Sequence, residues 1–234
     1  QSKFIRGLRV TDKKIINVVE SVLIDFNNDI VDSLKKFGTD AISIHTKKNN
    51  IIKVTPEAKE LGFVGIPKKI NNDLIEKILN KKQVPIISPL GLGDDNHPYN
   101  INGDTAAGAI AKSLKSRRLL LMTNVEGVLD KDKKLINEIT STEVLKMVED
   151  NTITEGMIPK INTCLDAVKN GVTAVGIIDG RKQHSILFEI FSDKGSGTLI
   201  RKWKILKKWN TFYWILKGFV TENTTIIPLK EYLV

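Results

Sequence analysis

The stretch that decides the fold is Tyr99-Asn100-Ile101-Asn102-Gly103-Asp104-Thr105-Ala106-Ala107-Gly108-Ala109. Its two asparagines are two positions apart, so on an extended segment both side chains point to the same side. Asp104 then precedes small residues, a pattern typical of a helix that starts on a carboxylate cap. An extended segment that leads into a helix N-terminus brings backbone amides and a fixed anion beside a site for anions. The alternative interpretation is an ordinary Asx turn that caps an alanine-rich core helix.

Helical and extended patterns alternate along the rest of the chain. Apolar residues at helical spacing predict helices. Thr11 or Asp12 can cap the start of the first helix, and Gly38 ends the second. Apolar runs predict strands, and the last two are apolar enough for a sheet that is covered on both faces. We therefore expect an α/β protein with a mainly parallel, right-handedly connected sheet. The expected helices are residues 15–26, 30–37, 70–79, 143–148 and 157–169, and the expected strands are 41–44, 51–54, 84–90, 119–123 and 172–179.

The composition is that of a globular protein with one thiol. Hydrophobic residues make up 41% of the 234 residues, and no apolar run is long enough to cross a bilayer. No charged-then-apolar leader opens the chain. Cys164 is the only cysteine, which rules out a disulfide within the chain. A lone thiol fits a reducing compartment, and we expect a cytoplasmic protein.

The net charge of +9 is concentrated toward the C-terminal end. Residues 201–234 hold seven Lys or Arg, two Asp or Glu, and all three tryptophans. The remaining residues are only mildly basic, so we expect neither a nucleic acid nor a membrane as partner of the body. The tail beyond Lys202 interleaves lysines with aromatics, as in an interfacial amphipathic helix or an RNA-contacting arm. We favour a third interpretation, a read-through sequence that packs opportunistically.

Four segments taken together resemble one family, the acetylglutamate kinases of the amino acid kinase superfamily. They are Gly7–Asp12, Asn100–Ala107, Thr123–Asp130 and Gly156–Lys160. They occur in the family's order and at family-like spacing, and the similarity runs from about the first residue to Ile200. The resemblance implies a three-layer αβα sandwich with a mainly parallel central sheet, the carbamate kinase-like fold, without its first strands. It divides the chain into the remainder of an amino-acid-substrate lobe (1–116), a nucleotide-binding lobe (117–200) and a tail foreign to the family (201–234).

The implied reaction is the ATP-dependent phosphorylation of the γ-carboxylate of N-acetyl-L-glutamate, in arginine biosynthesis. The unperturbed pKa of such a carboxylate is about 4.3, so the nucleophile is ionised at neutral pH and needs no general base. What the reaction requires is the alignment of two anions and the stabilisation of charge on the transferring phosphoryl group.

The resemblance assigns three residues to substrate binding and two to catalysis. Arg9 matches the arginine that holds the substrate's α-carboxylate, a role that its planar, bidentate guanidinium suits. Asn100 is assigned to the substrate, and Asn102 helps to build the same surface. Asp104 matches the aspartate that orients lysines, and Lys160 matches the lysine that stabilises the transition state. Without the motifs, Arg9 would be an ordinary surface arginine and Lys160 a solvated helix lysine.

The resemblance also implies a nucleotide site for ATP with Mg²⁺. We expect the magnesium ion to arrive with ATP, and no metal site built from protein carboxylates. Many relatives have aspartate where this chain has Asn124, which still accepts a hydrogen bond from a ribose hydroxyl but without charge. The residues assigned to the nucleotide are Asn124, Val125, Glu126, Gly127, Val128, Leu129, Thr152, Ile153 and Thr154.

A fifth match, His184–Phe191 followed by Gly195–Ile200, resembles the arginine-inhibited branch of the family. The glutamate and first glycine of that branch help to cage L-arginine, which places the effector against Glu189 and Gly195. The alternative is a C-terminal amphipathic helix followed by a glycine turn. Family members assemble as dimers and the arginine-inhibited ones as hexamers, so we expect a homo-oligomer.

The sequence departs from the family in its phosphate loops. Neither the Lys-x-Gly-Gly loop nor the second, His-Gly-Gly-Gly-like loop is present. Because both belong to the phosphate clamp, we expect this chain alone to be inactive or nearly so. The alternatives are another relative such as a carbamate, uridylate or aspartate kinase, a non-catalytic arginine-binding or partner-binding remnant, and a basic RNA or membrane binder through the tail.

Overall fold

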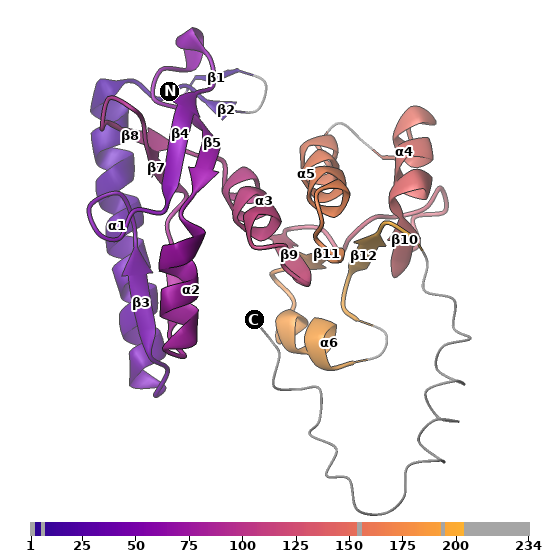
Figure 1. Ribbon diagram of the computed structural model, residues 1–234. Helices are drawn as coiled ribbons and strands as arrows, with labels where there is room; N and C mark the ends of the chain where they lie inside the picture. The colour runs from indigo at the N-terminus through magenta and orange to yellow at the C-terminus, as the bar shows by residue number, and fades with distance from the viewer. Residues whose placement is uncertain (1–2, 6–7, 154–155, 193–194, 204–234) are drawn as a thin grey trace, which may run out of the picture. The chain divides into compact units, whose positions relative to one another are not determined.

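A computed structural model describes residues 3–5, 8–153, 156–192 and 195–203 of the chain. The chain divides into two compact units, Gln1–Leu114 and Lys115–Val234 (Figure 1). This division lies two residues before the 116/117 boundary expected from the sequence. The substrate and nucleotide roles of the two lobes stay predictions.

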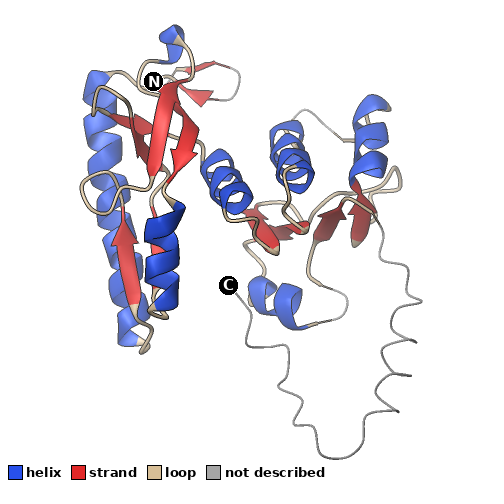
Figure 2. Ribbon diagram, viewed as in Figure 1, coloured by secondary structure: helices blue, strands red, loops and turns tan. Residues whose placement is uncertain are grey.

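The first unit mixes helices and strands throughout (Figure 2). In chain order its elements are β1 (Phe4–Ile5), β2 (Leu8–Arg9), α1 (Lys13–Lys36), β3 (Ala41–Ile44), β4 (Ile52–Pro56), the 3₁₀ helix η1 (Lys59–Leu61), β5 (Gly65–Ile70), α2 (Asn72–Asn80), β6 (Val84–Ile87), β7 (Leu90–Leu92), β8 (Pro98–Asn100) and α3 (Gly103–Ser113).

Helix α1 runs unbroken for 24 residues, so the prediction of two shorter helices was wrong. Two asparagines and an aspartate at residues 27–29 are weak helix formers, but Asn27 is 3% exposed and makes tertiary hydrogen bonds. Its side-chain amide donates to Ile86 O (2.8 Å) and Ser88 Oγ (3.1 Å), and its Oδ1 accepts from the Ser43 hydroxyl (2.6 Å). These bonds fasten the helix to β3 and to the end of β6. At its start, Asp12 is the capping residue.

The strands of the first unit form mixed sheets. β3 pairs parallel with β6, and a four-stranded sheet has the order β5-β4-β7-β8, in which only the β4–β7 pair is parallel. The strand predicted over 84–90 is therefore two strands, separated at Ser88 and Pro89. Ser88 N–H donates to Ile44 O at the end of β3, whereas Pro89 has no N–H to continue the ladder and its carbonyl accepts from Ile101.

An apolar core packs the described elements of the first unit together. Its most buried members come from β3, β4 with the residue before it, α2, and the segment between β8 and α3, and each is at most 2% exposed: Ile44, Ile51, Ile52, Val54, Ile75 and Ile101. Ile101 separates Asn100 from Asn102, so burial of the isoleucine turns both asparagines away from the core.

The second unit is a sheet covered by helices on both sides. Its elements are β9 (Arg118–Thr123), β10 (Glu138–Thr140), α4 (Ser141–Glu149), α5 (Ile158–Lys169), β11 (Ala174–Asp179), α6 (Ser185–Phe191) and β12 (Thr198–Arg201). The strand order is β10-β12-β11-β9, with β12 antiparallel to β11 and the other two pairs parallel. Helices α4 and α5 lie on one side and α6 on the other (Figures 1 and 2).

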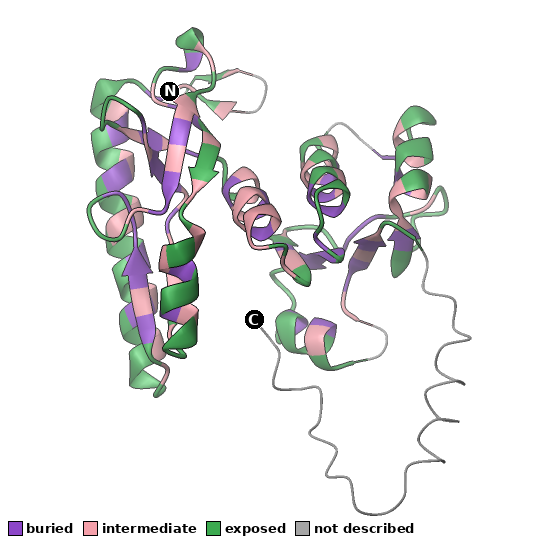
Figure 3. Ribbon diagram, in the orientation of Figure 1, coloured by how far each residue is buried: buried purple, intermediate pink, exposed green. Residues whose placement is uncertain are grey.

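This layering matches the αβα arrangement expected from the sequence. Every residue of β11 is buried (Figure 3), as its uninterrupted apolar sequence predicted. The α/β class with mixed and parallel pairings is confirmed, and the antiparallel pairs arise at hairpins and at β12. Within the part of the chain that the structure describes, no helix is both long and apolar enough to cross a membrane.

Candidate active site

The expected site residues divide between the two units. Arg9, Asn100, Asn102 and Asp104 belong to the first unit, and Lys160 belongs to the second. Thr154, which was expected at the nucleotide, lies outside the described residues.

In the first unit, backbone hydrogen bonds connect the Arg9 segment to the Asn100 segment through residues 61–64. Thr11 N–H donates to Leu61 O (3.0 Å), and Phe63 N–H donates to Thr11 O (2.7 Å). Asn100 N–H in turn donates to Phe63 O (2.9 Å). Residues 61–64 therefore lie between the two expected substrate segments and hold both in register.

Gly62 makes this close approach possible. Its φ is +68°, and a Cβ at this position would collide with the carbonyl oxygen of Thr11. Glycine alone combines a left-handed backbone with the absence of that carbon.

The side chain of Arg9 is exposed, and its guanidinium carbon lies 5.3 Å from the ring centroid of Phe4. A cation over an aromatic face is attracted weakly when the pair is open to solvent. The guanidinium therefore remains accessible to a carboxylate ligand.

Helix α3 starts two residues earlier than its sequence suggested. Asn102, not Asp104, is the N-cap, and its Oδ1 accepts from Thr105 N–H (3.1 Å). The prediction of a carboxylate cap was wrong, because asparagine caps as well as aspartate and comes first in the chain. Asp104 lies in the first turn, where a negative charge is favoured by the helix dipole.

An aromatic cluster beside Asn100 was not found from the sequence. The ring of Phe63 lies 5.4 Å from that of Tyr99 and 6.0 Å from that of His97. The Tyr99 hydroxyl donates to Asp95, and burial together with this bond raises the pKa of Tyr99. His97 and Tyr99 are two residues apart, but Phe63 comes from a loop more than thirty residues earlier, so local spacing does not signal the cluster.

The second unit contains a pocket of about 580 Å³. Of the residues expected at the nucleotide, six line it: Val125, Gly127, Val128, Leu129, Thr152 and Ile153. Asn124 and Glu126 are exposed and are not part of the lining. The lining also includes residues that the sequence did not single out, namely Asp130, Lys131, Lys133, Asp150, Asn151 and Met157.

An ion pair joins two sides of this pocket. Lys131 Nζ, from the turn after Leu129, lies 3.0 Å from Asp150 Oδ2, at the end of α4. Hydrogen bonds from Thr152 and the nearby Lys131 lower the pKa of Asp150. Apolar side chains and charged groups thus meet in one concavity, the usual composition of a small-molecule site.

Lys160 lies in the first turn of α5, three residues after Met157 of the pocket lining. Pro159 lies within the same first turn, where its missing N–H costs nothing. The helix start therefore carries Lys160 beside the segment that ends the pocket.

An ion pair ties a turn after β11 to the expected nucleotide loop. Arg181 makes a bidentate contact with Asp179, at 3.0 and 2.9 Å. These hydrogen bonds lower the pKa of Asp179 to about 2. Lys182 Nζ lies 2.7 Å from Glu126 Oε1, so the exposed Glu126 takes part in an ion pair with this turn.

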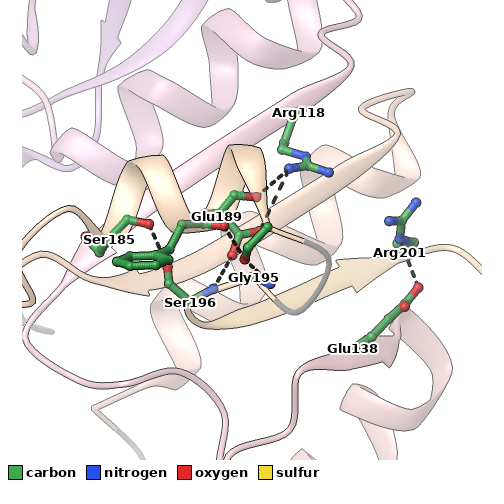
Figure 4. Close-up of polar contacts among 9 residues, drawn as sticks. Arg118, Glu138, Ser185, Glu189, Gly195, Ser196 and Arg201 are labelled. Atoms are coloured by element: carbon green, nitrogen blue, oxygen red, sulfur yellow. Dashed lines mark hydrogen bonds and ion pairs between the residues drawn. The ribbon is translucent and has the colours of Figure 1, made fainter. Parts of the chain in front are cut away.

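A second pocket, of about 470 Å³, contains both residues expected at an arginine effector (Figure 4). Glu189 is 6% exposed, and its Oε2 accepts from Ser196 N–H at 2.9 Å. Arg118 donates to the carbonyl of Glu189 (3.1 Å) and lies 4.0 Å from its carboxylate. The Cβ that Gly195 lacks would lie 2.7 Å from Glu189 Oε2.

The lining of this second pocket includes a further ion pair. Arg201 Nε lies 3.0 Å from Glu138 Oε1, and both residues belong to the lining. The pocket therefore holds two guanidinium groups and two carboxylates. Such a set complements a ligand that carries charges of both signs.

Comparison with known proteins identifies the family. The sequence matches the model of the amino acid kinase family over residues 1–179. It is 56% identical to the acetylglutamate kinase of Pelagibacter ubique (strain HTCC1062) over 202 residues, which cover 86% of this chain and 70% of that protein. The chain belongs to the amino acid kinase family.

Other relatives agree with this membership. The acetylglutamate kinase of Clostridioides difficile (strain 630) is 47% identical and covers 86% of this chain and 72% of the relative. Among solved structures, smu.665 from Streptococcus mutans UA159 has a TM-score of 0.73 at 32% identity, covering 86% of this chain and 78% of that one. The resemblance that the four motifs suggested is confirmed, and the amino acid kinase fold with it.

A more distant amino acid kinase fold shows the architecture alone. The N-acetylglutamate synthase of Neisseria gonorrhoeae, solved with coenzyme A and N-acetylglutamate, has a TM-score of 0.79 at 22% identity. The match covers 88% of this chain and 48% of that one.

Proposed function

We propose that this amino acid kinase family member binds N-acetyl-L-glutamate and ATP and transfers the γ-phosphoryl group to the substrate's γ-carboxylate. The observation that carries the proposal is the pocket of about 580 Å³, which six of the residues assigned to the nucleotide line together. The sequence relatives named acetylglutamate kinases support the choice of acid.

The apolar part of this pocket suits a purine. Val125, Val128, Leu129, Ile153 and Met157 supply flat apolar contact, and a cavity of several hundred Å³ has room for a base with its ribose. Asp130, Asp150 and Thr152 supply acceptors for amino and hydroxyl groups. Mg²⁺ accompanies ATP and shields its phosphate charge.

In the first unit, Arg9 and Asn100 are proposed to hold the acid. The exposed guanidinium binds the α-carboxylate in a bidentate manner, and the connected backbone of residues 61–64 fixes its distance from Asn100. Asp104 orients lysine, and Lys160 stabilises charge on the transferring group. Asn102 contributes to this surface mainly as the cap that fixes the start of α3.

The test is a direct measurement of ligand binding and transfer with a panel of acids. N-acetyl-L-glutamate, L-aspartate, carbamate and UMP are titrated into the protein by calorimetry with and without ATP, and any acyl phosphate is trapped with hydroxylamine. We expect N-acetyl-L-glutamate, and none of the other three compounds, to bind in the presence of ATP. Binding of UMP, carbamate or aspartate in its place would assign the chain to another member of the family.

The rate of transfer is a separate expectation. These 234 residues contain neither of the two glycine-rich loops that the resemblance places in the phosphate clamp, so on their own they supply only part of it. We therefore propose that the chain binds both substrates but turns them over slowly. Rapid accumulation of trapped acyl phosphate at substoichiometric protein would contradict this.

A second candidate function is control by L-arginine at the pocket of about 470 Å³. Its buried Glu189 and its Glu138 suit a guanidinium, and Arg118 and Arg201 suit an α-carboxylate. We expect L-arginine to bind and to lower ATP-dependent transfer, and L-citrulline, which lacks the charge, to bind far more weakly. Equal binding of both amino acids, or of neither, would remove the proposal.

We also propose that the protein self-associates through α1. Val18, Val22 and Phe26 follow one another at intervals of four residues and are 63%, 58% and 61% exposed. An apolar stripe of this kind on a long helix is typical of a contact surface. Light scattering after gel filtration measures the mass, and Val22→Asp is expected to give monomers if the stripe is the contact.

A further inference from the structure

A hydroxyl group joins β12 to the wall of the 580 Å³ pocket. The Oγ1 atom of Thr198 accepts a hydrogen bond from Val128 N–H at 2.8 Å and lies 3.5 Å from Val128 O. Thr198 is 1% exposed and Val128 is 2% exposed, so water does not compete for this contact. Val128 lines the pocket, whereas Thr198 lies behind it.

Two glycines let the backbone of the pocket wall approach β12 this closely. Gly127 has a φ of +144°, and a Cβ there would lie 2.5 Å from Thr198 Oγ1 and 2.8 Å from Leu135 Cδ1. At Gly197, a Cβ would collide with the carbonyl of Ile177 in β11. Residues 127 and 128 are therefore held against Thr198 of β12, and the start of β12 is in turn held against β11.

The hydrogen bond matters because Val128 N–H is buried. Leaving a buried N–H without an acceptor destabilises the protein by more than an average hydrogen bond stabilises it. The segment would therefore shift until Val128 N–H finds another acceptor. Such a shift moves Gly127, Val128 and Leu129, three consecutive residues of the pocket lining. The carbonyl oxygen of Val128 accepts a separate hydrogen bond from Ile136 N–H, which does not depend on the Thr198 hydroxyl.

We propose that Thr198 is a positioning residue for the nucleotide. It touches no ligand itself and acts by fixing the backbone of Val128 in the pocket wall. This inference rests on the proposed function, because it takes the pocket to be the ATP site.

The experiment compares ATP affinities by isothermal titration calorimetry in variants of the full chain. Thr198→Val removes the hydroxyl at nearly constant shape, and Thr198→Ser keeps it. We expect the ATP dissociation constant to rise about tenfold in Thr198→Val and to stay within about twofold of the parent in Thr198→Ser.

Thr140→Val is the matched control for a merely structural effect. Thr140 forms a capping box with Glu143 at the start of α4 and does not line the pocket. The same chemical change there removes a cap and lowers the unfolding temperature of the second unit. We expect it to leave the ATP dissociation constant within about twofold of the parent.

Each outcome bears on one of the two proposals. If the parent binds ATP and Thr198→Val binds it equally well, or if Thr198→Ser is as weak as Thr198→Val, the positioning role is wrong and the ATP site stands. If the parent binds no ATP, both fall. If Thr198→Val does not fold, hydrogen exchange in the parent decides: the Val128 amide must be protected and must slow further with ATP, and fast exchange overturns the role.

Discussion

Replacing Gly62 by alanine tests how the first unit holds its expected substrate residues. The change adds one carbon to a backbone with φ of +68°, facing the carbonyl oxygen of Thr11. The backbone at Gly62 has a φ of +68° and a ψ of −123°, a combination outside the left-handed helical region that costs a residue with a side chain about 1–3 kcal/mol. Relieving the collision also lengthens two backbone hydrogen bonds, Thr11 to Leu61 and Phe63 to Thr11. At about 1 kcal/mol each, these bring the expected loss of unfolding free energy to about 3–5 kcal/mol.

Gly38→Ala supplies the control in the same unit. Gly38 also has a positive φ, +82°, but a Cβ there meets nothing within 4 Å. Gly38→Ala therefore causes no collision, and we expect it to lower the unfolding free energy only by the conformational cost, about 1 kcal/mol. The difference between the two variants, about 2–4 kcal/mol, combines the collision with Thr11 O and the less favourable backbone conformation at Gly62.

The assay is hydrogen exchange of the amides of α1 and β4 in increasing urea, because these amides report on the first unit only. N-acetyl-L-glutamate affinity is measured in parallel, and we expect Gly62→Ala to weaken it at least tenfold by displacing Arg9, with Gly38→Ala unchanged. Equal destabilisation by the two variants would refute the packing argument. Unchanged affinity in Gly62→Ala would show that the Arg9 segment does not contact the acid.

Three further predictions concern single side chains. Arg9→Lys keeps the charge but loses the bidentate fork, so the N-acetyl-L-glutamate dissociation constant should rise about tenfold by calorimetry; no change would exclude Arg9 from the site. Lys160→Ala should lower the rate of acyl-phosphate formation about a hundredfold with ATP affinity altered less than about threefold, and an effect on affinity alone would contradict a transition-state role. In the parent, the Asp179 carboxyl has a pKa of about 2, below the unfolded value of about 3.9, so its stabilising effect is present above about pH 4 and is lost as the pH falls toward 2. Arg181→Ala should raise that pKa and flatten the loss of urea stability across this range; an identical pH profile would show that Arg181 is not its cause.

Local signals in the sequence were sufficient where structure is decided locally. The apolar run at 172–179 became β11, and the periodic residues at 157–169 became α5 with nearly the expected bounds. Four ordered motifs were enough to suggest the family. Most of the residues that the motifs assigned to the nucleotide line one pocket, although their contact with ATP stays a prediction.

Local signals failed where distant residues decide the outcome. Residues 27–29 suggest a helix end, and the contacts of Asn27 with Ser43, Ser88 and Ile86 help to keep α1 continuous there. The Lys131–Asp150 ion pair joins residues 19 positions apart and leaves no periodic trace.

The cap of α3 failed for a different reason. Asn102 and Asp104 are both good capping residues, and the choice between them depends on where the preceding strand β8 ends.

Strand β12 contacts the walls of two pockets of the second unit. Its first residue, Thr198, accepts a hydrogen bond from Val128 in the wall of the 580 Å³ pocket, and the next, Leu199, together with Arg201, lines the pocket proposed for L-arginine. A ligand that displaces this strand at one cavity therefore also displaces residues at the other cavity. By thermodynamic reciprocity, any factor by which the amino acid changes nucleotide affinity must equal the factor by which the nucleotide changes amino-acid affinity.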